Sequence, residues 1–295
     1  MGISVYQGDA DAMQSMLDQA DALLYEAKRA GRDRVMCTGA GQRRRDGHWD
    51  MNQVQSAITE KRVVAAYQPI VDLRTGGVVA DEALARIITR DGALVPAEKF
   101  ITAAESMNLV SRVDECVSQL ALAQPMPDRR QARSINLSSQ FLSDLEQVEA
   151  LVAQAGQSGR RRPYFVVEIS ERKSSEIAMM KRNLRPLVDA GFRIAVDDFG
   201  SGAASFMYLA ELPVHFLKIE GWMVKRIVAD RKVRQLIGAI ASTARSLKVN
   251  TVAECVENAE TAQVLCDLGV DWAQGYFFAR PVVEANSIEI SSEAA

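Results

Sequence analysis

Apolar runs of strand length alternate with amphipathic stretches of helix length from Met51 onward. Short apolar or alternating runs predict strands, and apolar residues spaced three and four apart predict helices. The strands are expected at 66–71, 78–85, 134–138, 164–170, 193–198, 215–220, 250–255 and 272–278. The helices are expected at 97–106, 110–123, 139–155, 174–190, 222–247 and 259–268. This alternation predicts an α/β fold, a (β/α)8 TIM-like barrel, with an open doubly wound sheet as the alternative.

The N-terminal region is too small to form a domain of its own. A short strand at residues 2–6 precedes a helical face that carries Met13, Leu17 and Leu24. Residues 38–50 are rich in Gly and Arg and lack periodicity, which is typical of a linker. The expected organisation is a fragment of a larger unit at 1–37, the linker at 38–50, the barrel at 51–285 and a tail at 286–295.

Composition narrows the kinds of molecule that the chain is expected to bind and the compartment in which it is expected to act. Lys and Arg number 35 against 38 Asp and Glu, a net charge of −3, so no positive field favours DNA or RNA. Four cysteines without Cys-x-x-Cys spacing suggest a reducing compartment rather than a disulfide framework. Without a bilayer-spanning apolar run, we expect no membrane contact by this chain and a cytoplasmic location, although a longer parent protein could carry an anchor.

Polar side chains interrupt the apolar strands in a regular way. From the second onward, every expected strand carries an acid, an amide or a lysine, namely Glu82, Asn136, Glu168, Asp197, Asp198, Lys218, Glu254 and Gln274. In a barrel such residues gather at the C-terminal mouth, where this fold builds its active sites. Several buried carboxylates are costly without cations, so the pattern predicts a metal site. With only two histidines, a hard cation such as Mg²⁺ or Mn²⁺ is favoured over zinc, and nucleophilic triads are disfavoured.

Asp197 and Asp198 end the strand expected at 193–198 and precede a glycine-rich turn. At a strand end the chain turns, so that neighbouring side chains can converge on one charged group. Two carboxylates held close together require either a cation or a shared proton. The alternative is that the Asp-Asp pair only begins a turn, because Asp and Gly are common turn residues.

Two other motifs carry little weight. Asp198-Phe199-Gly200 occurs in protein kinases, but the chain lacks their glycine-rich phosphate loop and their His-Arg-Asp catalytic loop. The Gly200-Ser201-Gly202 turn partly matches a dinucleotide-binding fingerprint, but the third glycine is missing and the preceding aspartates would repel a pyrophosphate.

Seven ordered motifs together resemble those of EAL-domain cyclic di-GMP phosphodiesterases. They are Glu82-Ala83-Leu84, Asn136-Leu137-Ser138, Glu168-Ile169-Ser170-Glu171, Asp197-Asp198-Phe199-Gly200, Leu217-Lys218-Ile219, Glu254-Cys255-Val256-Glu257 and Gln274-Gly275-Tyr276. The resemblance runs from about Tyr67 to Pro281. Residues 20–35 are similar to the last helix of GGDEF (diguanylate cyclase) domains, whose catalytic half is absent.

The resemblance implies hydrolysis of cyclic di-GMP to linear pGpG by water activated between two cations, Mg²⁺ or Mn²⁺. It also implies a homodimer. It assigns metal ligation to Glu82, Asn136, Glu168, Asp197 and Asp198. It assigns catalysis to Glu254, Lys218 and Gln274, and substrate contacts to Gln68, Leu84 and Arg86. Glu171 and Glu257 would support the loop after Asp198. Glu220, like these two residues, would not bind the cations directly.

Three departures from the family pattern leave a second function open. Glu220 stands where the family has Asp, Cys255 stands where Gly is common, and Ala203-Ala204 replaces the usual Tyr-Ser. None of these positions is an implied direct ligand. A receptor that binds cyclic di-GMP without efficient cleavage is therefore the first alternative, and a dimerising scaffold is the second.

Overall fold

The computed structural model describes residues 2–3, 36–37, 49–125, 131–157, 165–170, 177–200 and 205–283. Its contacts divide the chain into two units, residues 1–48 and 49–295. In the first unit, β1 (Gly2–Ile3) pairs in parallel with β2 (Met36–Cys37). The helix expected near residues 13–27, the linker at 38–48 and the tail at 286–295 lie outside the described residues.

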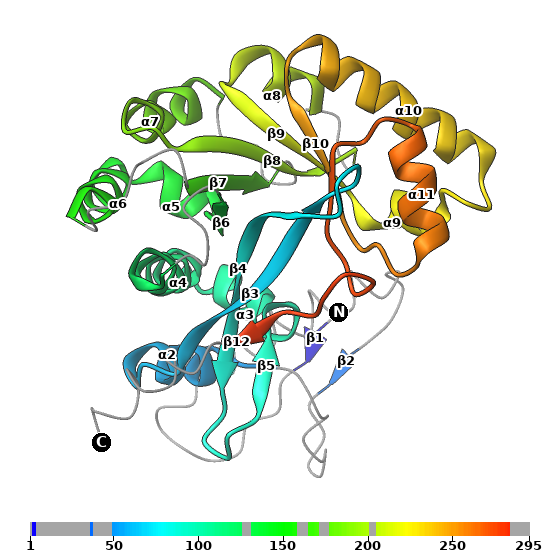
Figure 1. Ribbon diagram of the computed structural model, residues 1–295. Helices are drawn as coiled ribbons and strands as arrows, with labels where there is room; N and C mark the ends of the chain where they lie inside the picture. The colour runs from blue at the N-terminus through cyan, green and yellow to red at the C-terminus, as the bar shows by residue number, and fades with distance from the viewer. Residues whose placement is uncertain are drawn as a thin grey trace, which may run out of the picture. The chain divides into compact units, whose positions relative to one another are not determined.

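A closed ring of strands forms the second unit (Figure 1). The described strands of this unit are β3 (Val63–Asp72), β4 (Val78–Ile88), β5 (Leu94–Pro96), β6 (Ala132–Asn136), β7 (Phe165–Ser170), β8 (Arg193–Phe199), β9 (Val214–Ile219), β10 (Asn250–Ala253), β11 (Trp272–Ala273) and β12 (Val282–Val283). Of these, β5 pairs with β4 and β12 pairs with β3 outside the ring. Strands β4, β6, β7, β8, β9, β10 and β11 pair in parallel, and β3 closes the ring between β11 and β4. The predicted barrel is confirmed and the open-sheet alternative is wrong.

The first barrel strand runs antiparallel to both of its ring neighbours, unlike the strands of a regular (β/α)8 barrel. The reason is local, because only residues 73–77 join β3 to β4, and a connection this short forms a hairpin rather than a helical crossover. The Asp72 carboxylate accepts hydrogen bonds from the backbone N–H groups of Arg74 and Thr75, which stabilises the turn.

Helices cover the outside of the barrel (Figure 1). They are α2 (Met51–Thr59), α3 (Ala97–Ser106), α4 (Val110–Ala123), α5 (Ser139–Ser143), α6 (Leu145–Gln157), α7 (Ile177–Asp189), α8 (Ser205–Glu211), α9 (Gly221–Arg226), α10 (Arg231–Ser246) and α11 (Ala259–Asp267). The helix predicted at 222–247 is two helices, because the Asp230 side chain accepts from the N–H groups of Lys232 and Val233 and starts α10 anew. The stretch predicted at 139–155 is likewise divided into α5 and α6 at Asp144.

The barrel interior changes from apolar to charged along the strands. Ile70, Ala80, Val166, Phe216 and Val252 belong to one buried apolar cluster. Because side chains alternate faces, the residue two positions along each strand lies on the same inner side. Those residues include Glu82 after Ala80, Glu168 after Val166 and Lys218 after Phe216. A cavity of about 10 Å³, roughly the space of one water molecule, lies between the apolar cluster and these charges.

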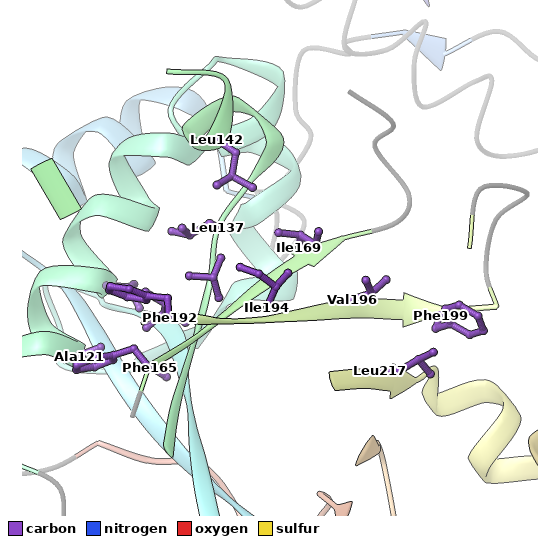
Figure 2. Packing of buried hydrophobic residues seen from close by; sticks show 14 of the residues in the cluster. Ala121, Leu137, Leu142, Phe165, Ile169, Phe192, Ile194, Val196, Phe199 and Leu217 are labelled. Carbon is purple, nitrogen blue, oxygen red and sulfur yellow. The ribbon is translucent and has the colours of Figure 1, made fainter. Parts of the chain in front are cut away.

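The outer faces of the strands pack on the helices in a larger apolar cluster. Figure 2 shows part of it, with Phe165, Ile169 and Ile194 on the strands and Ala121 on α4. Leu137 and Leu142, from the turn after β6 and from α5, belong to the same cluster (Figure 2). This packing fixes the strand ends from which the charged residues project.

Candidate functional site

Lys218 on β9 lies at the centre of the charged layer. Its Nζ is 2.6 Å from Glu168 Oε2 and 2.6 Å from Glu254 Oε1. It also lies 3.3 Å from Glu82 Oε2 and 3.4 Å from Asp197 Oδ1. The structure thus brings together carboxylates from β4, β7, β8 and the end of β10 around one ammonium, and four of the predicted acids meet there.

Amide side chains hold Glu82 from the other side. Asn136 Nδ2 donates to Glu82 Oε1 at 2.8 Å, and Gln274 Nε2 donates to Glu82 Oε2 at 2.9 Å. Gln274 Nε2 also donates to Gln68 Oε1 at 2.9 Å, and Gln68 Nε2 donates to the Ala279 carbonyl at 3.0 Å. Register explains the grouping, because Gln68 is the cross-strand partner of Glu82 on β3 and β4.

A bulge in β8 presents the two adjacent aspartates. The β8–β9 pairing shifts register between Val196 and Phe199, and Asp198 has a left-handed φ of 55°. A bulge re-aims side chains that would otherwise alternate faces. As a result, one carboxylate oxygen from each of Asp197, Asp198 and Glu254 lies within 4.8 Å of the others. The Asp-Asp pair therefore does more than begin a turn, since it converges with an acid from another strand end.

The pKa values of the acids around Lys218 shift in different directions, because burial and neighbouring acids raise them while Lys218 and hydrogen-bond donors lower them. Burial, the Glu82 charge and the Asp197 charge raise the pKa of Glu168 well above its usual range, against the effect of Lys218. Burial also opposes ionisation of Glu82, but Lys218 and the amides of Asn136 and Gln274 lower its pKa. For Glu254, burial raises the pKa to about 8 despite Lys218.

The pKa of the lysine is shifted as well. Burial disfavours the Lys218 ammonium, but Asp197, Glu168, Glu254 and Glu82 together raise its pKa well above the usual range. The ammonium is therefore the permanent charge of the cluster, and the carboxylates around it carry more negative charge than it can balance.

The donor set fits divalent cations. Within the described part of the chain, no hydrogen bond reaches the buried Oδ1 of Asp197. Carboxylate and amide oxygens are the ligands that Mg²⁺ and Mn²⁺ prefer, and the excess of acids over lysine supplies negative charge for such ions. Because its Nδ2 is engaged by Glu82, Asn136 would offer its Oδ1 to a cation.

The predicted substrate-contact residues lie on the strands β3 and β4. Gln68 is buried, whereas Leu84 and Arg86 are partly exposed. Burial lowers the pKa of Arg86, and the charges of Glu98, Tyr276 and Glu82 oppose that shift, so the guanidinium shares the electrostatic environment of Glu82. The Gln68 amide is bonded to Gln274 and Ala279, so the structure shows it within the polar network.

Glu257 and Glu220 lie outside the central cluster. Glu257 is exposed and its Oε1 lies 3.3 Å from Lys225 Nζ. Glu220 accepts a hydrogen bond from the Trp222 indole N–H at 2.8 Å. Glu171, together with Ala203 and Ala204, lies outside the described residues.

Cys255 follows Glu254 and is held in an unusual conformation. Its φ of 55° is in the left-handed region that favours glycine. Its side chain fills space left by Gly221, since a Cβ on Gly221 would lie 2.6 Å from Cys255 Sγ. The cysteine therefore depends on a glycine at the start of α9.

One polar residue beside the site was missed in the sequence. Asp114 is buried on α4 and accepts a hydrogen bond from the backbone N–H of Ser138, two residues after Asn136. The available signal was a carboxylate on the buried helix face of Val110, Val113 and Val117. Its partner, however, is distant in sequence and no local pattern indicates it.

Comparisons with known proteins identify relatives of this chain. A family model described as the EAL domain matches residues 51–281. The cyclic di-GMP phosphodiesterase PdeB of Shewanella oneidensis is 32% identical over 283 residues, which cover 91% of this chain and 32% of PdeB. A solved EAL domain protein from Listeria monocytogenes EGD-e has a TM-score of 0.73 at 27% identity, covering 83% of this chain and 98% of that protein.

A second solved structure, the PaMucR phosphodiesterase in complex with c-di-GMP, has a TM-score of 0.74 at 25% identity and covers 81% of this chain and 98% of that one. The chain spans between about a third and a half of the length of the first curated relatives that it matches. Among the described residues, no helix combines the length and the apolar character needed to cross a membrane.

Proposed function

This chain belongs to the EAL domain family, and from that premise we propose that it hydrolyses cyclic di-GMP to linear pGpG. The observation that carries the proposal is the convergence of Glu82, Glu168, Asp197 and Glu254 on Lys218 at the carboxyl ends of the barrel strands. This is the end at which barrel enzymes place their chemistry. The similarity to PdeB and to the PaMucR phosphodiesterase supports the choice of substrate.

Two divalent cations, Mg²⁺ or Mn²⁺, are part of the proposal. Glu82, Asn136, Glu168 and Asp197 would hold the first, and Asp197 and Asp198 the second. When bound, such a pair polarises a phosphodiester and lowers the pKa of the attacking water. The support in this structure is the oxygen-rich donor set and the buried Asp197 Oδ1, which accepts no hydrogen bond within the described residues and lies 3.4 Å from Lys218 Nζ.

Each of the other residues would have a separate task. Glu254 would accept the proton of the attacking water at its carboxylate, a form that nearby cations favour over the protonated one. Lys218 Nζ would offset the negative charge that develops on the phosphate oxygens. Arg86 would bind the second phosphate of the cyclic dinucleotide as a charge-assisted donor, with Leu84 and Gln68 lining the approach.

Gln274 would act through Glu82 and Gln68, since its amide bonds to both and holds them in register. Glu171 and Glu257 would support the loop that follows Asp198. We also propose that residues 1–37 derive from the end of a GGDEF domain, that the chain acts in the cytoplasm, and that it forms a homodimer.

A receptor that binds cyclic di-GMP without efficient cleavage is the second candidate. The observation in its favour is Cys255, whose left-handed backbone follows directly on Glu254. A displacement of Glu254 by about 1 Å could reduce turnover by about a hundredfold without removing binding.

Hydrolysis by the purified chain separates these functions. The chain is incubated with cyclic di-GMP and Mg²⁺ or Mn²⁺, and pGpG is followed by chromatography beside Glu82→Gln, Glu254→Gln and an EDTA control. Accumulation of pGpG that requires metal and fails in both variants supports the enzyme. Tight binding of cyclic di-GMP without product, measured by calorimetry, supports the receptor and overturns the proposed reaction.

A further inference from the structure

Asp114 is a buried carboxylate that the proposed reaction does not use. It lies within α4, among the buried residues Val110, Val113 and Val117, and is 7% exposed. A carboxylate in such surroundings is costly unless hydrogen bonds compensate it. The hydrogen bond that its carboxylate accepts indicates what the residue does.

The Asp114 carboxylate bonds to the turn between β6 and α5. Its Oδ2 accepts from the backbone N–H of Ser138 at 2.8 Å. Ser138 is the N-cap of α5, and its Oγ accepts from the N–H of Phe141 at 3.2 Å. Ser138 therefore joins α4 to the beginning of α5 through two different groups, its backbone N–H and its hydroxyl.

The same turn carries Asn136 into the site. Asn136 is the last residue of β6, and its Nδ2 donates to Glu82 Oε1 at 2.8 Å. The intervening Leu137 donates its N–H to the carbonyl of Glu168 at 3.1 Å. A continuous series of bonds thus runs from Asp114 through Ser138 to the two residues that flank Lys218, Glu82 and Glu168.

We propose that Asp114 is a positioning residue that fixes the turn at residues 136–138 and so holds the Asn136 amide on Glu82, ready for a cation. This inference rests on the proposed metal-dependent function. Without the carboxylate, the N–H of Ser138 loses its acceptor and the turn relaxes. Asn136 then samples positions in which its amide neither bonds to Glu82 nor faces the ligand cluster.

Matched variants of the full chain distinguish this role from general stability. Asp114→Leu removes the acceptor and keeps the branched shape of the side chain, as Asn183→Leu does in the control, and Asp114→Asn keeps one acceptor oxygen. Asn183→Leu is the control, because Asn183 is also a buried polar helix residue that bonds to backbone, donating to the Leu142 carbonyl at 2.8 Å. That bond lies at α5 and touches no strand end of the site.

Mn²⁺ affinity, measured by isothermal titration calorimetry without substrate, is the first readout. We expect Asp114→Leu to weaken Mn²⁺ binding by about 10–100-fold, the usual effect of losing a group that orients a metal ligand. Asp114→Asn should restore most of the affinity. Asn183→Leu should lower the melting temperature but leave Mn²⁺ binding unchanged.

Hydrogen exchange of the metal-free protein is the second readout. Peptides that span residues 132–138 and end before α5 should exchange faster in Asp114→Leu than in wild type or in Asn183→Leu. Should Asp114→Leu fail to fold, Ser138→Pro also removes the N–H donor that Asp114 accepts, together with the hydroxyl, at a φ of −67° that proline adopts. Ser138→Ala, which keeps the N–H, is its control.

Unchanged Mn²⁺ affinity in both Asp114→Leu and Ser138→Pro overturns the positioning role, and so does an equal loss in Asn183→Leu. Hydrolysis by the wild type is measured in parallel. Absence of pGpG formation in a wild type that binds Mn²⁺ overturns the proposed function, whereas the affinity series tests Asp114 separately.

Discussion

Lys218 Nζ lies 2.6 Å from Glu168 Oε2, and these side chains are 2% and 1% exposed. The pair is sealed from water, yet Glu82, Asp197 and Glu254 also approach the same ammonium. In the metal-free protein the lysine is thus an internal counter-ion for the acids proposed to hold cations. Lys218 then has a structural task besides the catalytic one proposed for it.

Replacing Lys218 should destabilise the metal-free protein. Lys218→Met leaves buried carboxylates without their counter-ion, and loss of one partner from a buried ion pair costs about 3–5 kcal/mol. We expect the free energy of unfolding in EDTA to fall by an amount of this order. We also expect Mn²⁺ to raise the melting temperature of the variant by more than that of wild type, because a cation supplies the missing positive charge.

The control for this prediction is Lys225→Met, which removes the exposed pair with Glu257. Exposed pairs contribute little, so its stability should match wild type. A Lys218→Met protein that is as stable as wild type in EDTA would contradict the counter-ion role.

The raised pKa of Glu254 predicts a pH dependence of stability in EDTA. Burial raises this pKa from 4.5 to about 8 in the folded protein. Between these values the folded form holds a proton that the unfolded form has released, so stability falls as pH rises from about 4.5 to about 8. Glu168, whose pKa is also raised, contributes in the same direction.

Glu254→Gln should flatten this decline because glutamine does not titrate. Denaturant unfolding at pH 5, 6, 7 and 8 in EDTA measures the slope for both proteins. Equal slopes in wild type and Glu254→Gln would show that the carboxylate already ionises near its ordinary pKa.

The sequence contained most of the information about the barrel and its charged strand ends. Strand alternation and a polar residue within each apolar run are local signals, so Glu82, Glu168 and Lys218 could be placed on strands directly. Their convergence follows from barrel closure, since parallel strands end at one mouth. The convergence of Asp197 and Asp198 was expected from a turn at the strand end, whereas the structure produces it with a bulge inside β8, which continues to Phe199.

Long-range pairings were not accessible in the same way. The antiparallel direction of β3 depends on a five-residue connection, 73–77, whose shortness was visible but not used. Strand 272–278 was predicted too long, because β11 ends at Ala273, and at Gly275 the Val256 backbone atoms approach too closely for any side chain. The bond from Ser138 to Asp114 spans 24 residues and has no periodic signature.

A second buried ion pair, Asp81–Arg133, should stabilise the barrel wall. Arg133 is fully buried, and its guanidinium donates to both Asp81 oxygens at 2.7 Å. It also donates to the carbonyls of Ala121 and Gln124 at the end of α4. Asp81→Asn leaves this guanidinium without a counter-charge and should cost about 3–5 kcal/mol in the free energy of unfolding.

Denaturant unfolding with Asp189→Asn as control tests this pair. Asp189 pairs with Arg185 on the exposed face of α7, so little change is expected there. If both variants lose the same small amount of unfolding free energy, the buried pair stabilises the barrel wall no more than an exposed pair would.

Gly221 and Cys255 should be energetically coupled. A Cβ at position 221 would lie 2.6 Å from the Cys255 Sγ and 2.9 Å from its Cβ. Gly221→Ala should therefore displace Cys255, reduce the free energy of unfolding by about 1–3 kcal/mol and slow any hydrolysis that depends on the neighbouring Glu254. Cys255→Gly should be tolerated, because its φ of 55° suits glycine and the lost side-chain contacts are offset by released strain.

The double variant decides whether the two positions act on one another. With glycine at 255, the space for the alanine methyl group is open, so Gly221→Ala should cost little in that background. Contacting residues typically show coupling of about 0.5–3 kcal/mol, and denaturant unfolding of the four proteins measures it. Additive losses would mean that Gly221 is needed for its own backbone rather than for Cys255. A coupled result would show that glycine at the start of α9 lets this chain carry a cysteine beside Glu254 without displacing the carboxylate.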